Sequence, residues 1–385
     1  MNLLLFNAEF GGNKGAEAML LTVLQWLQER DFHGTVFLER PQNTSTELTT
    51  KSMASLGSLP YSWDWFDFSP SRFLAYILSG YKDSMRKKIK IDMAIDLGGL
   101  AFHDSSIKGC LRTLFRFLPL RLRRVPYHFF IQDFGPMKKY RTRLMASLTL
   151  KGAGKIFTRS DFSQQQVLGL GGLQEKVLGP YPDMTLKLKA KKYSAKTNMP
   201  KCYVVVSPSV IPYLHEGEIY LYFLETLSRK ILKRFPIVIL VHTFQVGATL
   251  SDSTVAQELA RRLQGKEVLL LNENLDARIL KGVISSAKLA ISSRFHVLVA
   301  ALSTGVPVLG LGWNPKYEEL FSLYSIPEAA LTTAISEFEM DSKLSAFFQP
   351  YFKVKLREMN RKALNRLREA FHQLEQEIRK IQMES

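Results

Sequence analysis

The sequence predicts an α/β protein of two tandem Rossmann-like domains with a cleft between them. Short apolar segments of strand length alternate with helix-length segments along most of the chain, which is typical of parallel sheets covered by helices. This alternation is interrupted once, by a lysine-rich stretch near residues 187–201. The 385 residues are long enough for a core on each side of that stretch.

The predicted N-terminal domain, residues 1–186, opens with a strand at 3–6, a glycine-rich turn at 11–15 and a helix at 16–30. Met19, Val23 and Leu27 share one face of that helix. Further strands are expected at 35–38, 93–97, 128–132, 155–158 and 176–178. The aromatic-rich residues Tyr61, Trp63, Trp65, Phe66 and Phe68 are assigned to substrate specificity or membrane contact.

Residues 187–201 are predicted to be a linker, and residues 202–345 a second domain. Its strands are expected at 203–206, 236–241, 267–271, 289–292 and 307–311. Residues 350–385 predict a long amphipathic helix, because Leu356, Leu367 and Leu374 belong to one apolar stripe. We expect this helix to pack back on the N-terminal domain; a coiled-coil partner is the alternative.

The charge composition predicts an anionic partner. Lys and Arg number 52 against 35 Asp and Glu, a net charge of +17, which suits nucleic acid, a phosphorylated substrate or an anionic membrane. The two cysteines, Cys110 and Cys202, allow neither a disulfide framework nor a Cys-rich zinc site. The chain shows no signal peptide and no apolar run of transmembrane length, so we expect a cytoplasmic protein.

The segment Lys108–Lys155 is strongly basic, with Asp133 as its one acid. Because Leu and Phe accompany these cations, we favour an interfacial segment on an anionic membrane. An ordinary basic surface is the alternative, and nucleic acid is not an expected partner.

A second group of cations is predicted at one rim of the C-terminal sheet. The strand ending at Ser292 is followed by Ser293, a good N-cap, and by an apolar helix that must be buried. Arg294 and His296 then stand on the first turn of this helix, whose N-terminus suits an anion. Lys316 follows the next strand, so the three side chains are expected on one rim.

These residues also carry a resemblance. Ser293-Arg294-Phe295-His296, followed by Gly305-Val306-Pro307 and Lys316, resembles the signature of the polysaccharide pyruvyl transferase family. Further blocks stand in the family's order at Asn7–Ala18, Asp96–Leu100, Gln132–Pro136, Thr158–Ser163, Leu168-Gly169 and Pro182-Asp183. One departure is Gly15-Ala16-Glu17, where the family usually has Gly-Asp-Glu.

The resemblance implies transfer of a pyruvyl group from phosphoenolpyruvate to two hydroxyls of a sugar. A ketal forms and phosphate is released; the acceptor is a surface polysaccharide or its lipid-linked precursor. It also implies a glycosyltransferase-B-like fold and no metal or cofactor beyond the donor substrate. An enzyme of this kind is expected in the cytoplasm or peripherally on the inner face of the cytoplasmic membrane.

The site residues follow from the same motifs. Phosphoenolpyruvate carries nearly three negative charges, and arginine binds both carboxylate and phosphate. Arg159, Arg294, Phe295, His296 and Lys316 are assigned to this donor. Arg294, His296 and Lys316 are also the expected catalytic residues, His296 as general acid or base.

The acceptor is expected against the N-terminal domain. Polar groups suited to sugar hydroxyls are Asn7, Asn13, Glu17, Asp96 and His103. Asn13 and Glu17 fit equally well as groups that cap the turn and the first helix.

Two other functions stay open at this point. One is a two-domain glycosyltransferase that uses a nucleotide-sugar, with Glu318-Glu319 holding the ribose. The other is a non-enzymatic basic scaffold, which the presence of Arg294, His296 and Lys316 disfavours.

Overall fold

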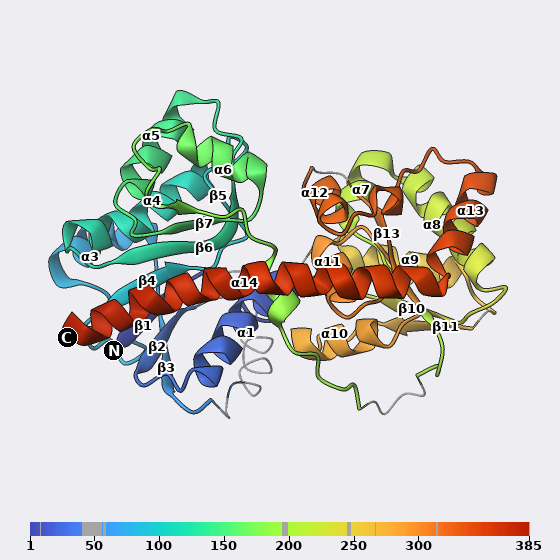
Figure 1. Cartoon of the computed structure of the whole chain (residues 1–385), viewed down its shortest axis with the longest axis horizontal. Helices are drawn as coiled ribbons and strands as arrows, with labels where there is room; N and C mark the ends of the chain where they lie inside the picture. The colour runs from blue at the N-terminus through green and yellow to red at the C-terminus, as the bar shows by residue number, and fades with distance from the viewer. Residues whose placement is uncertain are drawn as a thin grey trace.

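The computed structural model describes residues 1–7, 9–40, 56, 59–194, 199–244, 248–265, 267–312 and 315–384. Two parallel sheets, each covered by helices, lie side by side, and one long helix crosses both (Figure 1). The α/β fold with two Rossmann-like units is therefore confirmed. The proposed domain limits, 1–186 and 202–345, stay a prediction, although the described strands of the two sheets fall on either side of the lysine-rich stretch.

The N-terminal sheet has the strand order β3-β2-β1-β4-β6-β7-β8, and β5 pairs with β6. Its strands are β1 (Asn2–Phe6), β2 (Thr35–Glu39), β3 (Ser62–Phe66), β4 (Met93–Asp96), β5 (Leu100–Ala101), β6 (Tyr127–Phe134), β7 (Ile156–Thr158) and β8 (Val177–Leu178). The predicted strands are all present, whereas β3 and β5 were not predicted.

Strand β3 corrects the interpretation of the aromatic-rich region. Trp65, Phe66 and Phe68 are buried, and Phe66 and Phe68 pack edge-on against Phe6 of β1. Trp63 is partly buried and packs against Trp65. Pairing of β3 with β2 places Trp65 and Phe66 in the hydrophobic cores, so burial accounts for these rings without a ligand or a membrane.

Helices α1 (Lys14–Glu29), α3 (Phe73–Ser79), α4 (Ile107–Leu122), α5 (Tyr140–Leu150) and α6 (Asp161–Leu168) belong to this domain. Short 3-10 turns lie at η2 (Pro70–Arg72) and η3 (Met184–Lys187). Side chains at the N-caps begin three of the helices: Asn13 caps α1, Ser106 caps α4 and Ser160 caps α6.

The C-terminal sheet has the order β11-β10-β9-β12-β13-β14. Its strands are β9 (Val204–Ser207), β10 (Ile237–Leu240), β11 (Val268–Leu271), β12 (Leu289–Ser292), β13 (Val308–Leu311) and β14 (Ala330–Leu331). Its helices are α7 (Val210–Glu216), α8 (Glu218–Ile231), α9 (Asp252–Arg262), α10 (Ala277–Ser285), α11 (Phe295–Ser303), α12 (Lys316–Leu323) and α13 (Glu337–Phe347), with a 3-10 turn η4 (Pro327–Ala329).

Both sheets reverse their strand order beside their first strand, between β1 and β4 and between β9 and β12. Parallel sheets bind ligands beyond the carboxyl ends of their strands at such switch points. Asn7 follows β1 and Gly98 follows β4, while Arg294 follows β12. The topology therefore directs both switch points toward one site.

Helix α14 (Pro350–Glu384) runs along both domains (Figure 1). Near its start, Asn360 accepts a hydrogen bond from the Tyr324 hydroxyl at 2.5 Å and donates to the Leu302 carbonyl. Near its end, the Phe371 ring packs against Trp26 and Phe130. The prediction that this helix packs back on the N-terminal domain is confirmed, and its first half also covers the C-terminal domain.

The lysine-rich stretch contacts both domains where it is described. Lys187 lies in η3 rather than in a linker, and Lys187 and Lys189 pair with Glu29 of α1. The Lys191 amide donates to the Arg278 carbonyl of α10 at 2.9 Å. Residues 195–198 lie outside the described part of the chain.

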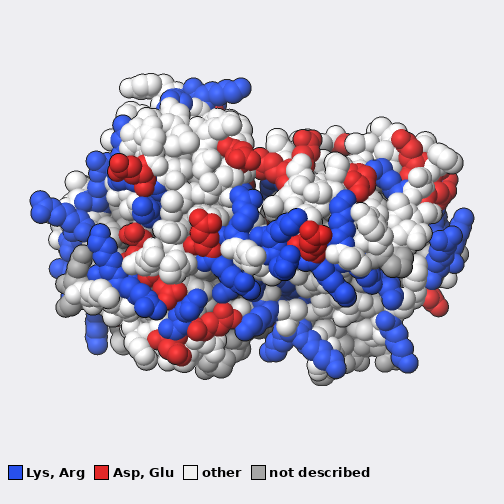
Figure 2. Space-filling view, viewed as in Figure 1, with Lys and Arg blue, Asp and Glu red and all other residues white. Residues whose placement is uncertain are grey.

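Figure 2 shows Lys and Arg side chains over both domains on the face that α14 crosses, with Asp and Glu side chains among them. Among the described residues, every helix is too short or too polar to cross a membrane.

Candidate functional site

A cleft of about 970 Å³ lies between the two domains. Its N-terminal wall consists of residues after β1, β4 and β6 together with α4; its C-terminal wall consists of the N-termini of α11 and α12. Of the predicted site residues, those that line it are Asn7, Asn13, His103, Arg159, Arg294, Phe295, His296 and Lys316. Glu17 and Asp96 do not line it and are buried behind its wall.

The base of the cleft is a close junction between the domains. Asn13 and Thr243 form an isolated antiparallel bridge, and the Phe244 amide donates to the Gly12 carbonyl at 2.9 Å. Glu17 accepts hydrogen bonds from the Ala277 amide at 2.9 Å and from Lys14 Nζ at 2.7 Å. Glu17 therefore joins α1 to α10 from a buried position, and its role at an acceptor stays a prediction.

The N-terminus of α11 differs from the prediction by one residue. Its N-cap is Arg294, not Ser293, and the Arg294 amide donates to the Ser292 hydroxyl at 2.9 Å. The Ser293 hydroxyl instead bonds the Tyr220 hydroxyl at 2.8 Å, and its carbonyl accepts from the Tyr317 hydroxyl at 2.8 Å. Two buried tyrosines thus fix this turn, so that Arg294 and His296 face the cleft.

Arg294 is paired with a buried carboxylate. Its Nε donates to Asp252 Oδ2 at 2.6 Å and its Nη2 donates to Asp252 Oδ1. Asp252 is fully buried at the start of α9, whereas the Arg294 side chain is 20% exposed. This bidentate pair orients the guanidinium and leaves Nη1 as the nitrogen that Asp252 does not use.

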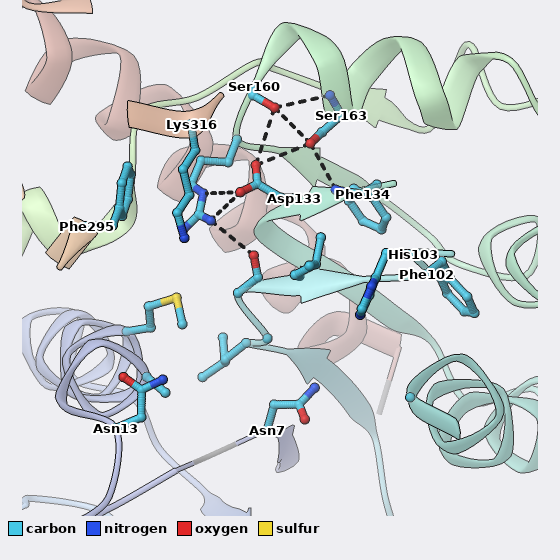
Figure 3. Close-up of a pocket in the computed structure, with 18 of the residues that line it drawn as sticks. Asn7, Asn13, Phe102, His103, Asp133, Phe134, Ser160, Ser163, Phe295 and Lys316 are labelled. Atoms are coloured by element: carbon cyan, nitrogen blue, oxygen red, sulfur yellow. Dashed lines mark hydrogen bonds and ion pairs between the residues drawn. The ribbon is translucent and has the colours of Figure 1, made fainter. Parts of the chain in front are cut away.

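Arg159 is held more tightly than the sequence suggests. It forms an ion pair with Asp133 (Figure 3), a second ion pair with Asp183 at 2.8 Å, and a hydrogen bond to the Gly99 carbonyl at 3.1 Å. Burial opposes its charge, but the two carboxylates raise the pKa of Arg159 above its usual value. Because every guanidinium nitrogen already has a partner, direct recognition of a ligand by Arg159 would require one of these pairs to open.

His296 belongs to α11 of the C-terminal domain, and its ring lies against Gly15 and Asp183 of the N-terminal domain. Its Nε2 lies 3.7 Å from Asp183 Oδ2 and, in the described part of the chain, has no hydrogen-bond partner. Burial lowers the pKa of His296 to about 4, although Asp183 opposes this shift. A Cβ on Gly15 would lie 2.1 Å from His296 Nδ1, so this glycine makes room for the imidazole. His296 is therefore neutral at pH 7 when the cleft holds no ligand.

Two further titratable groups face the cleft from α12. Lys316 Nζ lies 5.1 Å from the centroid of the Phe295 ring, and Arg159 stacks on the same ring at 5.2 Å. Burial and the neighbouring Arg159 lower the pKa of Lys316 to about 8. Burial and Asp133 raise the pKa of Glu319 to about 7. Glu318 is exposed and does not line the cleft.

On the acceptor side, the predicted side chains already have partners. Asn7 Nδ2 donates to Asp96 Oδ1 at 2.6 Å, and Asn7 Oδ1 accepts from Arg116 Nη1 at 2.8 Å. Asn13 caps α1 by accepting from the Gly15 amide at 3.0 Å. His103 Nδ1 lies 2.5 Å from the Ser105 hydroxyl, and burial lowers the pKa of His103.

Asp96 orients Asn7 from behind the cleft wall, and its predicted role at an acceptor stays a prediction. It is fully buried, and burial raises the pKa of this carboxyl group. Its Oδ1 also accepts a hydrogen bond from the Gly98 amide at 2.8 Å.

The carboxylates that hold the arginines were not predicted as site residues. Asp133 and Asp183 lie inside segments that carry the family resemblance, so their positions were visible but their partners were not. Asp252 follows a capping serine, Ser251. It is 42 residues away from Arg294 in the sequence, and only the fold brings the two side chains together. The sequence suggests Glu319 only as a ribose ligand, paired with Glu318.

In the described residues, no group of three or more His, Cys, Asp or Glu side chains could hold a metal ion. The absence of a metal requirement stays a prediction.

Comparison with known proteins adds a family and a fold. A family model for polysaccharide pyruvyl transferases matches residues 13–315. No protein with a curated description matches the chain significantly. Among solved structures, UDP-GlcNAc 2-epimerase from Neisseria meningitidis bound to UDP-GlcNAc is similar at 14% identity and a TM-score of 0.60, covering 96% of this chain and 100% of that one.

Two further solved structures are similar in fold to this chain. A putative UDP-N-acetylglucosamine 2-epimerase from Listeria monocytogenes has 14% identity and a TM-score of 0.64, covering 98% of this chain and 96% of its own. Anabaena HepE in complex with UDP has 12% identity and a TM-score of 0.57, covering 98% and 99%. At such identities the likeness concerns the fold, and it confirms the glycosyltransferase-B-like arrangement.

Proposed function

We propose a function for this chain on the premise that it belongs to the polysaccharide pyruvyl transferase family, whose model matches residues 13–315. The proposed reaction moves the pyruvyl group of phosphoenolpyruvate onto two hydroxyls of a sugar, forms a ketal and releases phosphate. The proposed acceptor belongs to a surface polysaccharide or to its lipid-linked precursor. The observation that supports this reaction best is the rim where Arg294, His296 and Lys316 surround the N-terminus of α11.

This rim suits a small trianion. Arg294 offers Nη1 beside its pair with Asp252, and Lys316 adds a point charge from the neighbouring helix. The first turn of α11 adds free amides and the positive end of a helix dipole. In this proposal Arg159 does not bind the donor directly, because its guanidinium is paired with Asp133 and Asp183. It supports the site by stacking on the Phe295 ring.

The proton balance assigns roles to two groups. One proton must reach the methylene carbon of phosphoenolpyruvate, which makes C2 electrophilic. The first sugar hydroxyl then adds to C2 and the second displaces phosphate, so two hydroxyl protons leave. One of these replaces the proton delivered to the methylene, and the other leaves with hydrogen phosphate.

His296 and Glu319 fit these proton transfers. His296 is neutral at pH 7 and can accept a hydroxyl proton. Glu319, with a pKa near 7, is partly protonated and can donate one. We propose His296 as the general base and Glu319 as the general acid, with no metal or cofactor beyond the donor; activity that survives EDTA treatment would agree with the last point.

Binding and turnover test the reaction. Phosphoenolpyruvate should raise the melting temperature of the chain, and Lys316→Met should weaken that effect. Phosphate release with a sugar acceptor should fall at least about a hundredfold in His296→Ala, which corresponds to loss of a general base. Turnover near the wild-type rate in His296→Ala would contradict its role.

A nucleotide-sugar-dependent transferase is the second candidate, and one observation favours it. The solved structures that share this fold include complexes with UDP-GlcNAc and with UDP. Glu319 lines the cleft and could face a ribose, whereas Glu318 does not. Stabilisation by UDP-GlcNAc but not by phosphoenolpyruvate would select this candidate.

We further propose a peripheral position on the inner face of the cytoplasmic membrane. Helices α3, α4 and α5 pack beside one another over one face of the N-terminal sheet and expose large apolar side chains. The most exposed are Leu74, Leu78, Leu122 and Tyr140, at 70%, 80%, 58% and 77%. Arg124 and Arg141 are exposed on the same helices or directly after them. We call this surface the α3–α5 face; its combination of apolar and cationic groups fits an anionic lipid surface.

A further inference from the structure

The N-terminal wall of the cleft carries arginines that the proposed reaction does not use. Gly109, Arg112, Thr113 and Arg116 all line the cleft. Their spacing along α4 is i, i+3, i+4 and i+7, so they form one face of this helix. The cleft-facing side of α4 therefore carries two guanidinium groups.

Arg116 is fully occupied by protein groups. Its Nε and Nη2 donate to Glu39 Oε1 at 3.2 and 2.6 Å, and its Nη1 donates to Asn7 Oδ1 at 2.8 Å. The residue is 5% exposed and lies over the rings of Phe6 and Phe68. Arg116 and Glu39 thus satisfy each other as a buried pair.

Arg112 must share the same carboxylate. Its Nη2 lies 3.3 Å from Glu39 Oε1, while its Nε is buried and has no hydrogen-bond partner in the described residues. The side chain is 31% exposed, and Glu39 is 4% exposed. Two guanidinium groups therefore share one oxygen of a buried carboxylate, and in the described residues the Nε of Arg112 is left without a hydrogen-bond acceptor.

The other carboxyl groups near this wall are bonded elsewhere: Asp96 accepts from Asn7 and from the Gly98 amide, and Glu9 accepts from the Asn13 amide. Arg40 also lines the cleft, but it adds a cation and pairs with Asp67 at 3.0 Å. Burial and the proximity of Arg116 lower the pKa of Arg112, which agrees with a charge that its surroundings do not fully compensate. A bound anion would supply the missing compensation.

The position of this wall separates it from the donor rim. In Figure 3, Asn7 lies on the opposite side of the cavity from Lys316 and Asp133. Because Arg116 is bonded to Asn7, the α4 arginines belong to the side of the cleft that the proposed function assigns to the acceptor.

We propose that Arg112 binds an anionic group, phosphate or carboxylate, carried by the molecule on the acceptor side of the cleft. A guanidinium recognises either group through two parallel hydrogen bonds, and the N-terminus of α4 adds a positive dipole end. The group is the phosphate of a carrier or the carboxylate of an acidic sugar. This inference rests on the proposed function only in calling that side of the cleft the acceptor side.

Calorimetric titration of the full chain, saturated with phosphoenolpyruvate, tests the site with two probes. Inorganic pyrophosphate represents a phosphate carrier, and glucuronic acid represents an acidic sugar. We expect one of them to bind, and Arg112→Gln to weaken it about tenfold, as for loss of a charge-assisted pair. Arg112→Lys keeps the charge and should weaken it less. Arg141→Gln, the same change at an exposed position outside the cleft, should leave it unchanged.

The outcomes separate this site from the donor site. Arg112→Gln should keep its affinity for phosphoenolpyruvate, and Lys316→Met should lose that affinity but keep the probe. Equal probe affinity in Arg112→Gln and wild type, or binding of neither probe to wild type, would overturn the proposal. If phosphoenolpyruvate does not bind but a probe still requires Arg112, the proposed function fails and this site stands.

Discussion

At the scale of single residues, the shape of the site depends on how closely Gly15 approaches His296. The cap at Asn13 places the first turn of α1 against the imidazole, and a Cβ at position 15 would lie 2.1 Å from His296 Nδ1. Real Cβ atoms do not come this close, so the ring must move if the glycine is replaced.

We therefore expect Gly15→Ala to lower turnover by at least about tenfold with a loss of stability of about 1–3 kcal/mol, typical of overpacking. Gly99→Ala is the matched control at the cleft, because its Cβ would meet only Met19 Cε at 3.6 Å. Steady-state kinetics and urea unfolding of both variants measure the difference. Equal turnover in the two variants would show that the position of His296 does not limit the reaction.

The alkaline side of the pH profile of kcat/KM should reflect the titration of two residues of α12, Glu319 and Lys316. Glu319 must be protonated to donate, and its pKa is raised to about 7, so kcat/KM should fall as the pH rises through 7. Lys316 must be charged to bind the donor, and its pKa is lowered to about 8, so the fall should steepen above 8. Glu319→Gln should remove the first step and Lys316→Arg should move the second upward. A profile that is flat from pH 6 to 9 would contradict both roles.

Residue types were easier to predict from the sequence than residue partners. Arg294, His296 and Lys316 were placed on one rim because a strand end and a helix start are local patterns. Asp252 and Asp183, which hold Arg294 and Arg159, come from other elements and have no local signature. For the same reason, Glu17 was assigned to the acceptor, although the fold buries it against Lys14 and α10.

At the scale of elements, α1 connects the two domains through one buried carboxylate. Glu17 accepts from Lys14 Nζ, the Gly11 amide and the Ala277 amide, and both Lys14 and Glu17 are at most 1% exposed. Removing Glu17 leaves an ammonium group buried without its ion-pair partner, which is far costlier than losing an exposed pair.

Glu17→Ala should therefore lower the free energy of unfolding by roughly 3–5 kcal/mol. Glu29→Ala on the same helix removes the partly exposed pairs with Lys187 and Lys189 and should cost less than about 1 kcal/mol. Urea unfolding followed by circular dichroism compares them. A similar loss in both variants would argue that Lys14 finds another partner.

Elements were predictable where their pattern is strong. The central strands are continuous apolar runs, and the stripe of α14 is long, so both were found. Strand β3 is hard to predict because the polar–apolar alternation of its sequence, SWDWF, lasts only four residues before Phe66 breaks it. Strand β5 was missed because it has two residues, too few for any period to be read.

At the scale of the whole molecule, the positive charges behind the net charge of +17 lie partly in the cleft and partly on the outer surface. Arg159 and Arg294 are neutralised by buried aspartates, so the cleft uses less of the excess than the sequence suggested. Much of the rest is on the outside, where Lys and Arg lie over both domains (Figure 2). On the α3–α5 face these cations accompany exposed leucines, and this pairing of charge with apolar area is what distinguishes membrane contact from general solubility.

The α3–α5 face should bring the chain to anionic vesicles and not to neutral ones. We expect flotation with phosphatidylglycerol vesicles at low salt, no flotation with phosphatidylcholine, and release at about 0.5 M salt, where the Debye length is only a few Å. Leu74→Asp with Leu78→Asp should abolish flotation, because it removes apolar area and adds negative charge. Ile219→Asp with Tyr222→Asp is the matched control: those side chains are 64% and 66% exposed on α8 of the other domain. If both double variants float equally, or if wild type floats with neither lipid, the α3–α5 face is an ordinary basic surface.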